Sequence, residues 1–420
     1  MLPLHALLTE RREAVQIGGA LGDWQAITIK FSGEVLPRER VHAFKGTMFA
    51  AYPGDLVFSK IDARNGAVGL IPAGIPKAVV TSEYPVFTPK ADKLRADYVN
   101  YLLRAEHFKA DLKRKASGTS GRKRVTPEGF LSLEVPVPTL AEQDVLVAAY
   151  LDALARAAQL EREAEAIECA GWKAFEAALG VARPPPLPDR PVFVARFKDV
   201  ERWSHDGILR GVTGRYSESA ETSMEPLDNA LQEVRHGCSS GPSKTPTKLR
   251  ILKISAVTKG RLDLNEHKFI TDKASLRDQF SLRAGDILMC RTNGTLAYVG
   301  MSALVEADIE DTIFPDKVIR VRPDLNRIEP KFLWRLLQLP ALRIQIESAA
   351  RTAVGNFAIG GKDIKALKVP LPALERQGVL AEALNDAVVT AEGKRAEAAA
   401  LRDSAWAAFE AALFTPPESI

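Results

Sequence analysis

The sequence has few cysteines and histidines and no long hydrophobic run. Its three cysteines, Cys169, Cys238 and Cys290, are far apart and odd in number, which indicates a reducing cytoplasm rather than a disulfide framework. The six histidines have no metal-ligand spacing, so we expect no zinc site. No apolar stretch approaches about 20 residues, and the first residues do not resemble a signal peptide, so we expect no membrane segment.

Recognisable catalytic motifs are also missing. The sequence has no Asp/Asn-Pro-Pro-Tyr/Phe motif, which would hold a flipped base for methylation, no Gly-x-Gly cofactor loop after a strand and no Walker A motif. It has no convincing Ser/His/Asp or Cys/His set. Asp111 and Lys113 match the short acid–x–Lys pattern of nucleases, and we attribute this match to chance. Together these absences favour a binding subunit that is not an enzyme.

The formal net charge of +4 is unevenly distributed along the chain. Residues 139–180 contain eight acidic and three basic residues, and residues 373–414 contain seven and four. By contrast, residues 104–124 contain eight basic and two acidic residues, and residues 331–368 contain seven and two. The chain therefore combines two acidic segments with a basic remainder that could meet a polyanion.

An internal repeat divides the chain into two copies of one unit. Residues 135–180 align with 369–414 without a gap at an offset of 234, and 21 of 46 positions are identical. The preceding regions match more weakly, for example at Gly54–Lys60 with Gly285–Arg291. The order of features is kept while most of the sequence has changed. A common fold with a diverged surface is what two domains that recognise different targets would need.

A helix of roughly 40 residues is predicted at the end of each copy, over 139–180 and 373–414. Prolines precede both segments, and Ala, Leu, Glu and Arg are abundant within them. Apolar residues at steps of three or four, such as Val147, Leu151 and Leu154, form one face. Such a helix reaches about 60 Å. We therefore expect the two helices to pair as an intramolecular antiparallel coiled coil, although each could instead pack on its own domain.

The predicted fold class is α+β, with two pseudo-repeated mixed α/β domains separated by the two long helices. The domains are expected over 1–138 and 193–372, with a Pro-rich linker over 181–192. Short β-like runs such as Val79–Phe87 and a helix near 95–113 or 328–349 are expected within them.

Two features of the sequence resemble type I restriction–modification specificity subunits. One is the repeated Pro-x-Pro-x-Leu-x-x-Gln helix start, and the other is the stretch from Gly54 to Gly66, which looks like one version of their target-recognition domain. The resemblance covers about residue 20 to residue 414. The second copy departs from it, because 193–230 is unusually long and the second Gly-Asp segment lacks the Asp-Ala-Arg-Asn-Gly continuation.

The resemblance implies that each domain reads one half of a split double-stranded DNA site and that the helices set the spacing between the halves. It also implies that the helices seat two methyltransferase subunits and that restriction subunits can join the complex. S-adenosylmethionine, ATP and Mg²⁺ would then belong to these partners, and no cofactor is expected in this cytoplasmic chain.

Candidate DNA-binding residues follow from residue type and position, because Lys and Arg neutralise phosphates and Arg, Lys and Asn read base edges. For phosphates we expect Lys113, Arg114, Lys115, Arg122, Lys123, Arg124, Lys244, Lys248, Arg351 and Lys362. For bases we expect Lys60, Arg64, Asn65, Arg291 and Asn293, while Asn356 lies with Arg351 in the loop opposite 116–121. Any one of them could instead be an ordinary surface residue.

Two other functions remain open from the sequence. One is a nuclease or methyltransferase with an unrecognised active site. The other is a scaffold that binds proteins through its coiled coil and has no role on DNA.

Overall fold

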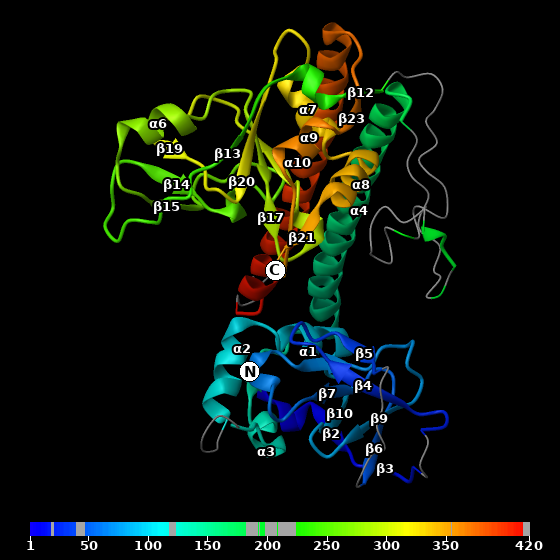
Figure 1. Cartoon of the computed structure of the whole chain (residues 1–420). Coiled ribbons are helices and arrows are strands. Elements are labelled where there is room, and N and C mark those ends of the chain that lie inside the picture. Colours follow the sequence, from blue (N-terminus) through cyan, green and yellow to red (C-terminus); the bar gives the residue numbers. More distant parts are fainter. Residues whose placement is uncertain are drawn as a thin grey trace, which may run out of the picture. The chain divides into compact units, whose positions relative to one another are not determined.

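The computed structural model describes residues 1–17, 21–38, 47–116, 123–181, 192, 194–197, 208, 224–353 and 355–414 (Figure 1). The chain forms two compact units. Unit 1 comprises Met1–Arg162 and Lys394–Ile420, and unit 2 comprises Glu163–Gly393. Most of the predicted linker, the loop 117–121 and most of 193–223 lie outside the described residues.

Unit 1 is a mixed α/β domain. One sheet has the order β2-β10-β7-β8, a second has the order β3-β6-β9-β4-β5, and β1 pairs with β11. The strands are β1 (Leu2–Pro3), β2 (Leu8–Arg11), β3 (Ala14–Val15), β4 (Gln25–Ile29), β5 (Val35–Pro37), β6 (Met48–Ala51), β7 (Leu56–Phe58), β8 (Val68–Leu70), β9 (Ala78–Thr81), β10 (Val86–Pro89) and β11 (Glu134–Val135). The helices are α1 (Ala96–Leu102), α2 (Glu106–Lys115) and α3 (Pro127–Leu131), with a 3₁₀ turn η2 (Ala63–Asn65).

Unit 2 repeats part of this arrangement. One sheet has the order β13-β20-β16-β18, and β12 pairs with β23. Two further sheets have the orders β15-β14-β19 and β17-β22-β21. The strands are β12 (Met224–Pro226), β13 (Leu231–His236), β14 (Arg250–Leu252), β15 (His267–Phe269), β16 (Ile287–Cys290), β17 (Thr292–Asn293), β18 (Ser302–Leu304), β19 (Thr312–Ile313), β20 (Val318–Pro323), β21 (Arg351–Ala353), β22 (Asn356–Ala358) and β23 (Lys368–Pro370). The helices are α6 (Ala274–Phe280), α7 (Pro330–Leu336), α8 (Pro340–Ala349) and α9 (Gly361–Lys365).

The duplication extends from the long helices into the two domains. The bounds of α1, α2 and α3 recur as those of α7, α8 and α9 at the same offset of 234 that aligns the helix sequences. The sheets β2-β10-β7-β8 and β13-β20-β16-β18 have equivalent strand orders. The predicted mixed α/β fold built on two copies of one unit is therefore confirmed.

Some predicted elements are divided in the structure. The helix expected near 95–113 is two helices, because Ala105 has extended backbone between α1 and α2. The helix expected near 328–349 is also broken, since Pro340 starts α8 after the extended Leu339 and a proline has no N–H to continue the α7 hydrogen bonds. The run Val79–Phe87 is likewise two strands, β9 and β10, joined by a turn.

The two long helices are α4 (Leu140–Ala178) and α10 (Leu374–Ala412). Within unit 1, the ring centroid of Tyr150 lies 5.5 Å from that of Trp406, and Arg402 forms an ion pair of 2.6 Å with Glu161. Within unit 2, a Cβ atom on Gly171 would lie 2.7 Å from the Cβ of the facing alanine on α10, residue 387. These pairs run in opposite directions along the two helices, as the predicted antiparallel coiled coil requires.

A buried glutamine ties each long helix to its domain. Gln143 is fully buried; its amide accepts a hydrogen bond of 2.8 Å from the Arg95 N–H and donates to the Lys93 and Pro138 carbonyls. Gln377 makes the same set of bonds in unit 2, to the backbone of Glu329, Arg327 and Pro372. The glutamine of the repeated helix-start motif therefore fixes the loop before α1 or α7 against the helix.

The aspartate of each Gly-Asp pair is buried beneath the strand that follows it. Asp55 accepts the Tyr52 N–H and an ion pair of 2.8 Å from Arg11. Asp286 accepts a backbone N–H three residues before it and an ion pair of 2.6 Å from Arg322. The hydrogen bond to Asp286 raises the pKa of the Arg322 guanidinium. The motif therefore supports the sheet on which the candidate site is built.

Candidate nucleic-acid interface

In unit 1, the 3₁₀ turn η2 presents Arg64 and Asn65 beside α2. The turn ends at Gly66, whose φ of 102° suits glycine, and a Cβ there would lie 2.3 Å from the Phe31 carbonyl oxygen. This close approach fixes the turn against its neighbours, and η2 packs on α2. Asn65 is exposed and its amide donates to Asp62 at 3.3 Å, while Arg64 is half-buried.

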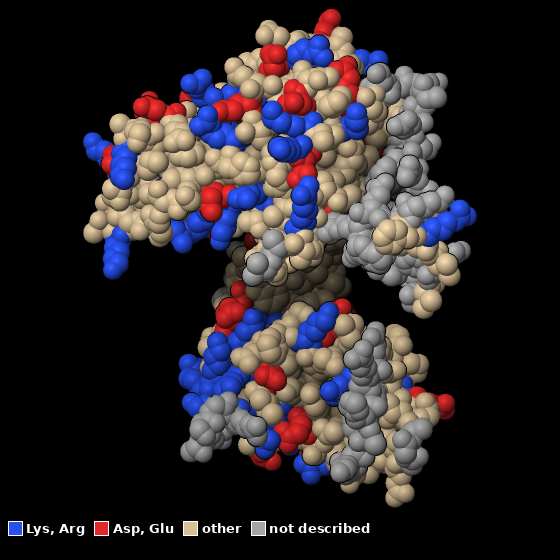
Figure 2. Space-filling view, viewed as in Figure 1, with Lys and Arg blue, Asp and Glu red and all other residues tan. Residues whose placement is uncertain are grey.

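The last turn of α2 carries three of the candidate phosphate contacts. Lys113, Arg114 and Lys115 are exposed there, and cations are stabilised near the C-terminus of a helix by the helix dipole. Arg114 pairs with Asp111, and Lys115 donates a hydrogen bond of 2.7 Å to Ser132. Figure 2 shows Lys and Arg side chains gathered over α2 in unit 1.

The segment after α2 continues this basic surface towards Lys60. Lys123 and Arg124 are exposed, and Arg124 lies 3.3 Å from Glu83. The Val125 N–H donates to the Lys60 carbonyl at 2.8 Å, which holds the segment beside the end of β7. Arg122 lies outside the described residues. The structure thus brings Lys60 and Arg124 together, and it brings Arg64 and Asn65 to α2.

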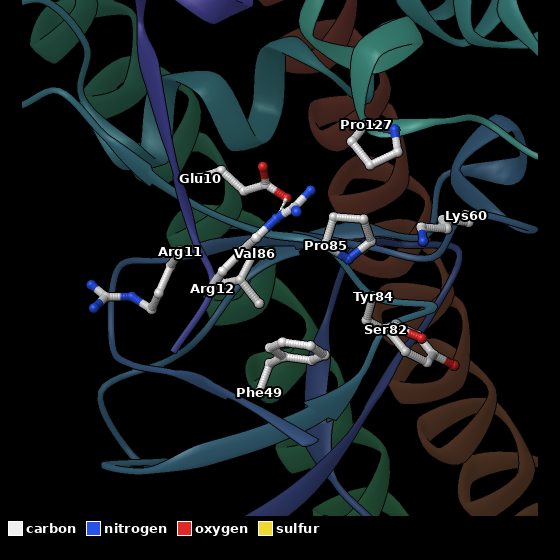
Figure 3. A pocket seen from close by; sticks show the side chains of 10 residues that line it. All are labelled: Glu10, Arg11, Arg12, Phe49, Lys60, Ser82, Tyr84, Pro85, Val86 and Pro127. Carbon is white, nitrogen blue, oxygen red and sulfur yellow. Dashed lines mark hydrogen bonds and ion pairs between the residues drawn. The ribbon is translucent and has the colours of Figure 1, made fainter. Parts of the chain in front are cut away.

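A hollow of about 300 Å³ opens beside Lys60 (Figure 3). Strand β2 and the turn between β9 and β10 supply much of its lining, and Phe49 and Pro127 complete it. Arg12 is held by Glu10 across an ion pair of 2.8 Å, and its side chain remains 70% exposed. The hollow therefore combines cationic groups with ring-bearing apolar walls.

In unit 2, three candidate residues lie on one small sheet rather than in a loop. The prediction that Arg351 and Asn356 occupy a loop is wrong, because they begin β21 and β22, and β22 also pairs with β17, which carries Asn293. Backbone pairing between strands replaces the flexible loop that the alignment with 116–121 indicated. Arg351 is 82% exposed and lies 3.5 Å from Asp363 of α9, next to the exposed Lys362.

Arg291 lies just before β17, and its side chain is held by the protein. It is half-buried, and its Nη1 donates to the Asp316 carbonyl at 3.1 Å. Burial, and then the charge of Arg291, lower the pKa of His236 on β13. Arg291 thus has a structural role, and its predicted contact with a base stays a prediction.

Lys244 and Lys248 lie apart from this sheet in the chain, on the segment between β13 and β14. Both are exposed. The pKa of Asp272 is lowered, mainly by its hydrogen bond from Arg277 and more weakly by the charge of Lys248. This interaction places Lys248 near α6, the helix that carries Arg277.

Two findings concern a buried thiol and metal ligands in the described part of the chain. Burial raises the pKa of the Cys290 thiol to about 11, so it is protonated at neutral pH. No group of three or more His, Cys, Asp or Glu residues suited to a metal ion occurs among the described residues. In the same part of the chain no helix is long and apolar enough to cross a membrane. What the surface does offer is hydrogen-bond donors and positive charge.

Sequence reasoning missed Glu10, Arg12, Ser82 and Tyr84, which line the hollow with Lys60. They lie far apart in the sequence and meet through the pairing of β2 with β10 and of β6 with β9. The alternation of Glu10 and Arg12 was the one signal available, because side chains two apart along extended backbone share a face, although β2 itself ends at Arg11.

Comparison with known proteins identifies a domain within the first copy. A family model of the "Type I restriction modification DNA specificity domain" matches residues 44–168. The chain is 28% identical over 254 residues to the EcoKI specificity subunit of Escherichia coli (strain K12), which covers 60% of this chain and 50% of that protein. It is 22% identical over 289 residues to the StySPI specificity subunit of Salmonella potsdam, and this alignment covers 67% of this chain and 56% of that protein. The chain thus spans about half the length of these curated relatives.

Solved structures share the fold over almost the whole chain. A chain from a study of complex assembly and conformational transition of the type I R-M system aligns with a TM-score of 0.56 and 16% identity, covering 98% of this chain and 95% of that one. The S subunit of the type I restriction–modification system from M. genitalium aligns with a TM-score of 0.51 and 11% identity, covering 99% and 96%. Residues 44–168 therefore match the type I restriction–modification DNA specificity domain, and the whole chain is similar in fold to solved structures of type I restriction–modification systems.

Proposed function

We propose that this chain is the DNA-reading subunit of a type I restriction–modification complex and is not itself an enzyme. One observation carries the proposal: two domains with equivalent short helices each place Lys, Arg or Asn side chains after the Gly-Asp strand, most of them half-buried, and exposed ones beyond the second short helix. Duplex DNA needs cations for its phosphates and Arg, Lys or Asn side chains for its base edges.

The two domains carry different side chains at equivalent places. Unit 1 has Lys113, Arg114 and Lys115 on the last turn of α2, whereas the equivalent turn of α8 contains Glu347 and no cation. Unit 2 instead presents Arg351 and Asn356 on a hairpin. Different side chains on the same frame favour two half-sites of different sequence. The paired helices α4 and α10 would then set the spacing between the half-sites.

Partner subunits would supply the catalytic activity. We propose that two methyltransferase subunits bind the paired helices and that restriction subunits can join them. S-adenosylmethionine, ATP and Mg²⁺ would be bound by those subunits. The acidic surface of the helices supports a protein partner there, because a second polyanion would be repelled.

The sequencing of methylated bases in the host, with and without this gene, tests the proposal directly. A split motif that disappears with the gene is the expected result. Shortening α4 and α10 together by four residues, about one turn, should shorten the spacer of that motif. An unaltered motif in both experiments would contradict the proposed function.

The phosphate contacts can be tested by salt dependence. Replacing Lys113, Arg114 and Lys115 by Ala should lower the slope of log K against log salt by about 0.9 for each phosphate that the variant no longer neutralises. The same is expected for Arg122, Lys123 and Arg124. A control is Lys30→Ala, because Lys30 is exposed in the same unit and already paired with Glu34. Fluorescence anisotropy with the duplex at several salt concentrations measures the slope, and an unchanged slope would reject the assignment.

A further inference from the structure

The hollow beside Lys60 contains donors that the protein does not use. Arg12 is held through its Nε by Glu10, and its two Nη atoms make no hydrogen bond with any residue that the structure describes. Because the Nε is fixed, the planar fork of the two Nη atoms is oriented while its outer edge stays open. A fork of this kind matches two acceptors on one planar group.

Lys60 is the second unused donor. Its backbone is fixed on both sides, because its N–H donates to the Glu83 carbonyl at 3.0 Å and its carbonyl accepts the Val125 N–H at 2.8 Å. Its ammonium group forms no hydrogen bond or ion pair within the described part of the chain. Figure 3 shows Arg12 and Lys60 on either side of Pro85. A fixed backbone and an unpaired side chain suit a residue that contacts a ligand.

The walls of the hollow restrict what can enter it. Phe49, Tyr84, Pro85 and Pro127 present rings to it, and its volume of about 300 Å³ exceeds the needs of a bare phosphate group. The carboxylate in its lining, Glu10, is already paired with Arg12. The groups left for a ligand are therefore mainly donors, so the ligand should present acceptors, and the ring-bearing walls favour a planar ligand.

The hollow lies near the helices that carry the basic surface of unit 1, because Pro127 of α3 lines it. The charges of Arg12 and Lys60 both help to lower the pKa of Glu128 on α3, after the hydrogen bonds that Glu128 makes at the start of that helix. Helix α3 in turn packs on α2, where Lys115 bonds to Ser132. DNA held by the last turn of α2 would therefore pass close to the hollow.

We propose that Arg12 and Lys60 read a guanine in the half-site bound by unit 1, and that Glu10 is a positioning residue for Arg12. In the major groove guanine presents two acceptors, O6 and N7, to which an Arg fork binds bidentately. Lys60 donates to the same edge or to that of the next base. This inference rests on the proposed function and assigns residues to part of it.

The test is the methylated motif of a host that carries the full complex with Arg12→Ala or Lys60→Met. One position of one half-site should lose its preference for guanine, by about 10- to 100-fold against the next best base. The rest of that half-site, and the whole of the other half-site, should stay unchanged. Lys30→Met is the matched control and should leave every position as in the wild type.

Milder variants separate base reading from folding. Arg12→Lys keeps the charge but lacks the fork, so the same position should relax even where Arg12→Ala abolishes methylation altogether. Glu10→Gln should relax that position less than Arg12→Ala, because the Gln oxygen can still accept from Arg12. A purely structural Glu10 would lower methylation without changing the motif.

The alternative outcomes overturn the inference. A uniform loss of methylation in both Arg12→Lys and Lys60→Met, with the motif intact, would make the two residues phosphate contacts. An unchanged motif with methylation at the wild-type level would show that the two residues have no role in recognising a base. The absence of any split motif with the wild-type gene would contradict the proposed function itself, and is distinguishable from both.

Discussion

The replacement of Gln143 by Ala should loosen the junction between the long helix and the domain of unit 1. Gln143 is fully buried and joins three backbone groups, the Arg95 N–H and the carbonyls of Lys93 and Pro138. Alanine leaves all three without this partner. Each hydrogen bond contributes about 1 kcal/mol net, and an unpaired buried amide costs more, so the free energy of unfolding should fall by about 2–4 kcal/mol.

Two measurements check this prediction. Urea denaturation followed by circular dichroism gives the global loss, and hydrogen–deuterium exchange gives the local one. The Arg95 amide should exchange about 10- to 100-fold faster, because its acceptor has gone. Gln377→Ala should raise the exchange rate of the Glu329 amide of unit 2 by a similar factor, because Gln377 accepts the equivalent hydrogen bond.

The control is Gln159→Ala, an exposed glutamine on the same helix. It should change stability by no more than about 0.5 kcal/mol. A loss below about 1 kcal/mol for Gln143→Ala, or an Arg95 amide whose exchange does not change, would refute the account of this junction.

Two further substitutions test the packing of the sheets. Gly69→Ala in β8 should destabilise unit 1 by about 1–3 kcal/mol in urea denaturation, because the new Cβ would lie 2.3 Å from the Gly33 carbonyl oxygen; Gly74→Ala, which meets nothing within 4 Å, is its control and should be nearly neutral. Arg322→Met should destabilise unit 2 by about 3–5 kcal/mol, since the carboxylate of Asp286 is only 1% exposed and would lose its cation. A melting temperature equal to that of the wild type in either case would contradict the packing described.

The duplication and the long helices were predictable because both follow from the order of residues within short segments of the sequence. Helix propensity and a repeat of three to four residues need no knowledge of distant contacts. The identical blocks around Gln143 and Gln377 and the shared offset revealed the repeat, and the structure extends it to every short helix that the two domains have in common.

The candidate site was predictable only in part. Basic runs such as Lys113–Lys115 are visible in sequence, and they do lie on an exposed helix end. The hairpin that carries Arg351 and Asn356 was not predictable, because its strands are short and one of its pairings is to β17, far back in the chain. Short strands depend on their partners more than on their own composition.

The sequence by itself determined that this chain is a repeated unit with acidic helices and basic domains, because composition and periodicity follow directly from residue order. Tertiary structure alone decided which side chains share a surface. Glu10, Arg12 and Lys60 meet at one hollow only because β2, β10 and the turn before β10 fold together. A site built from residues on separate strands is set by strand pairing, and that pairing is a property of the whole sheet.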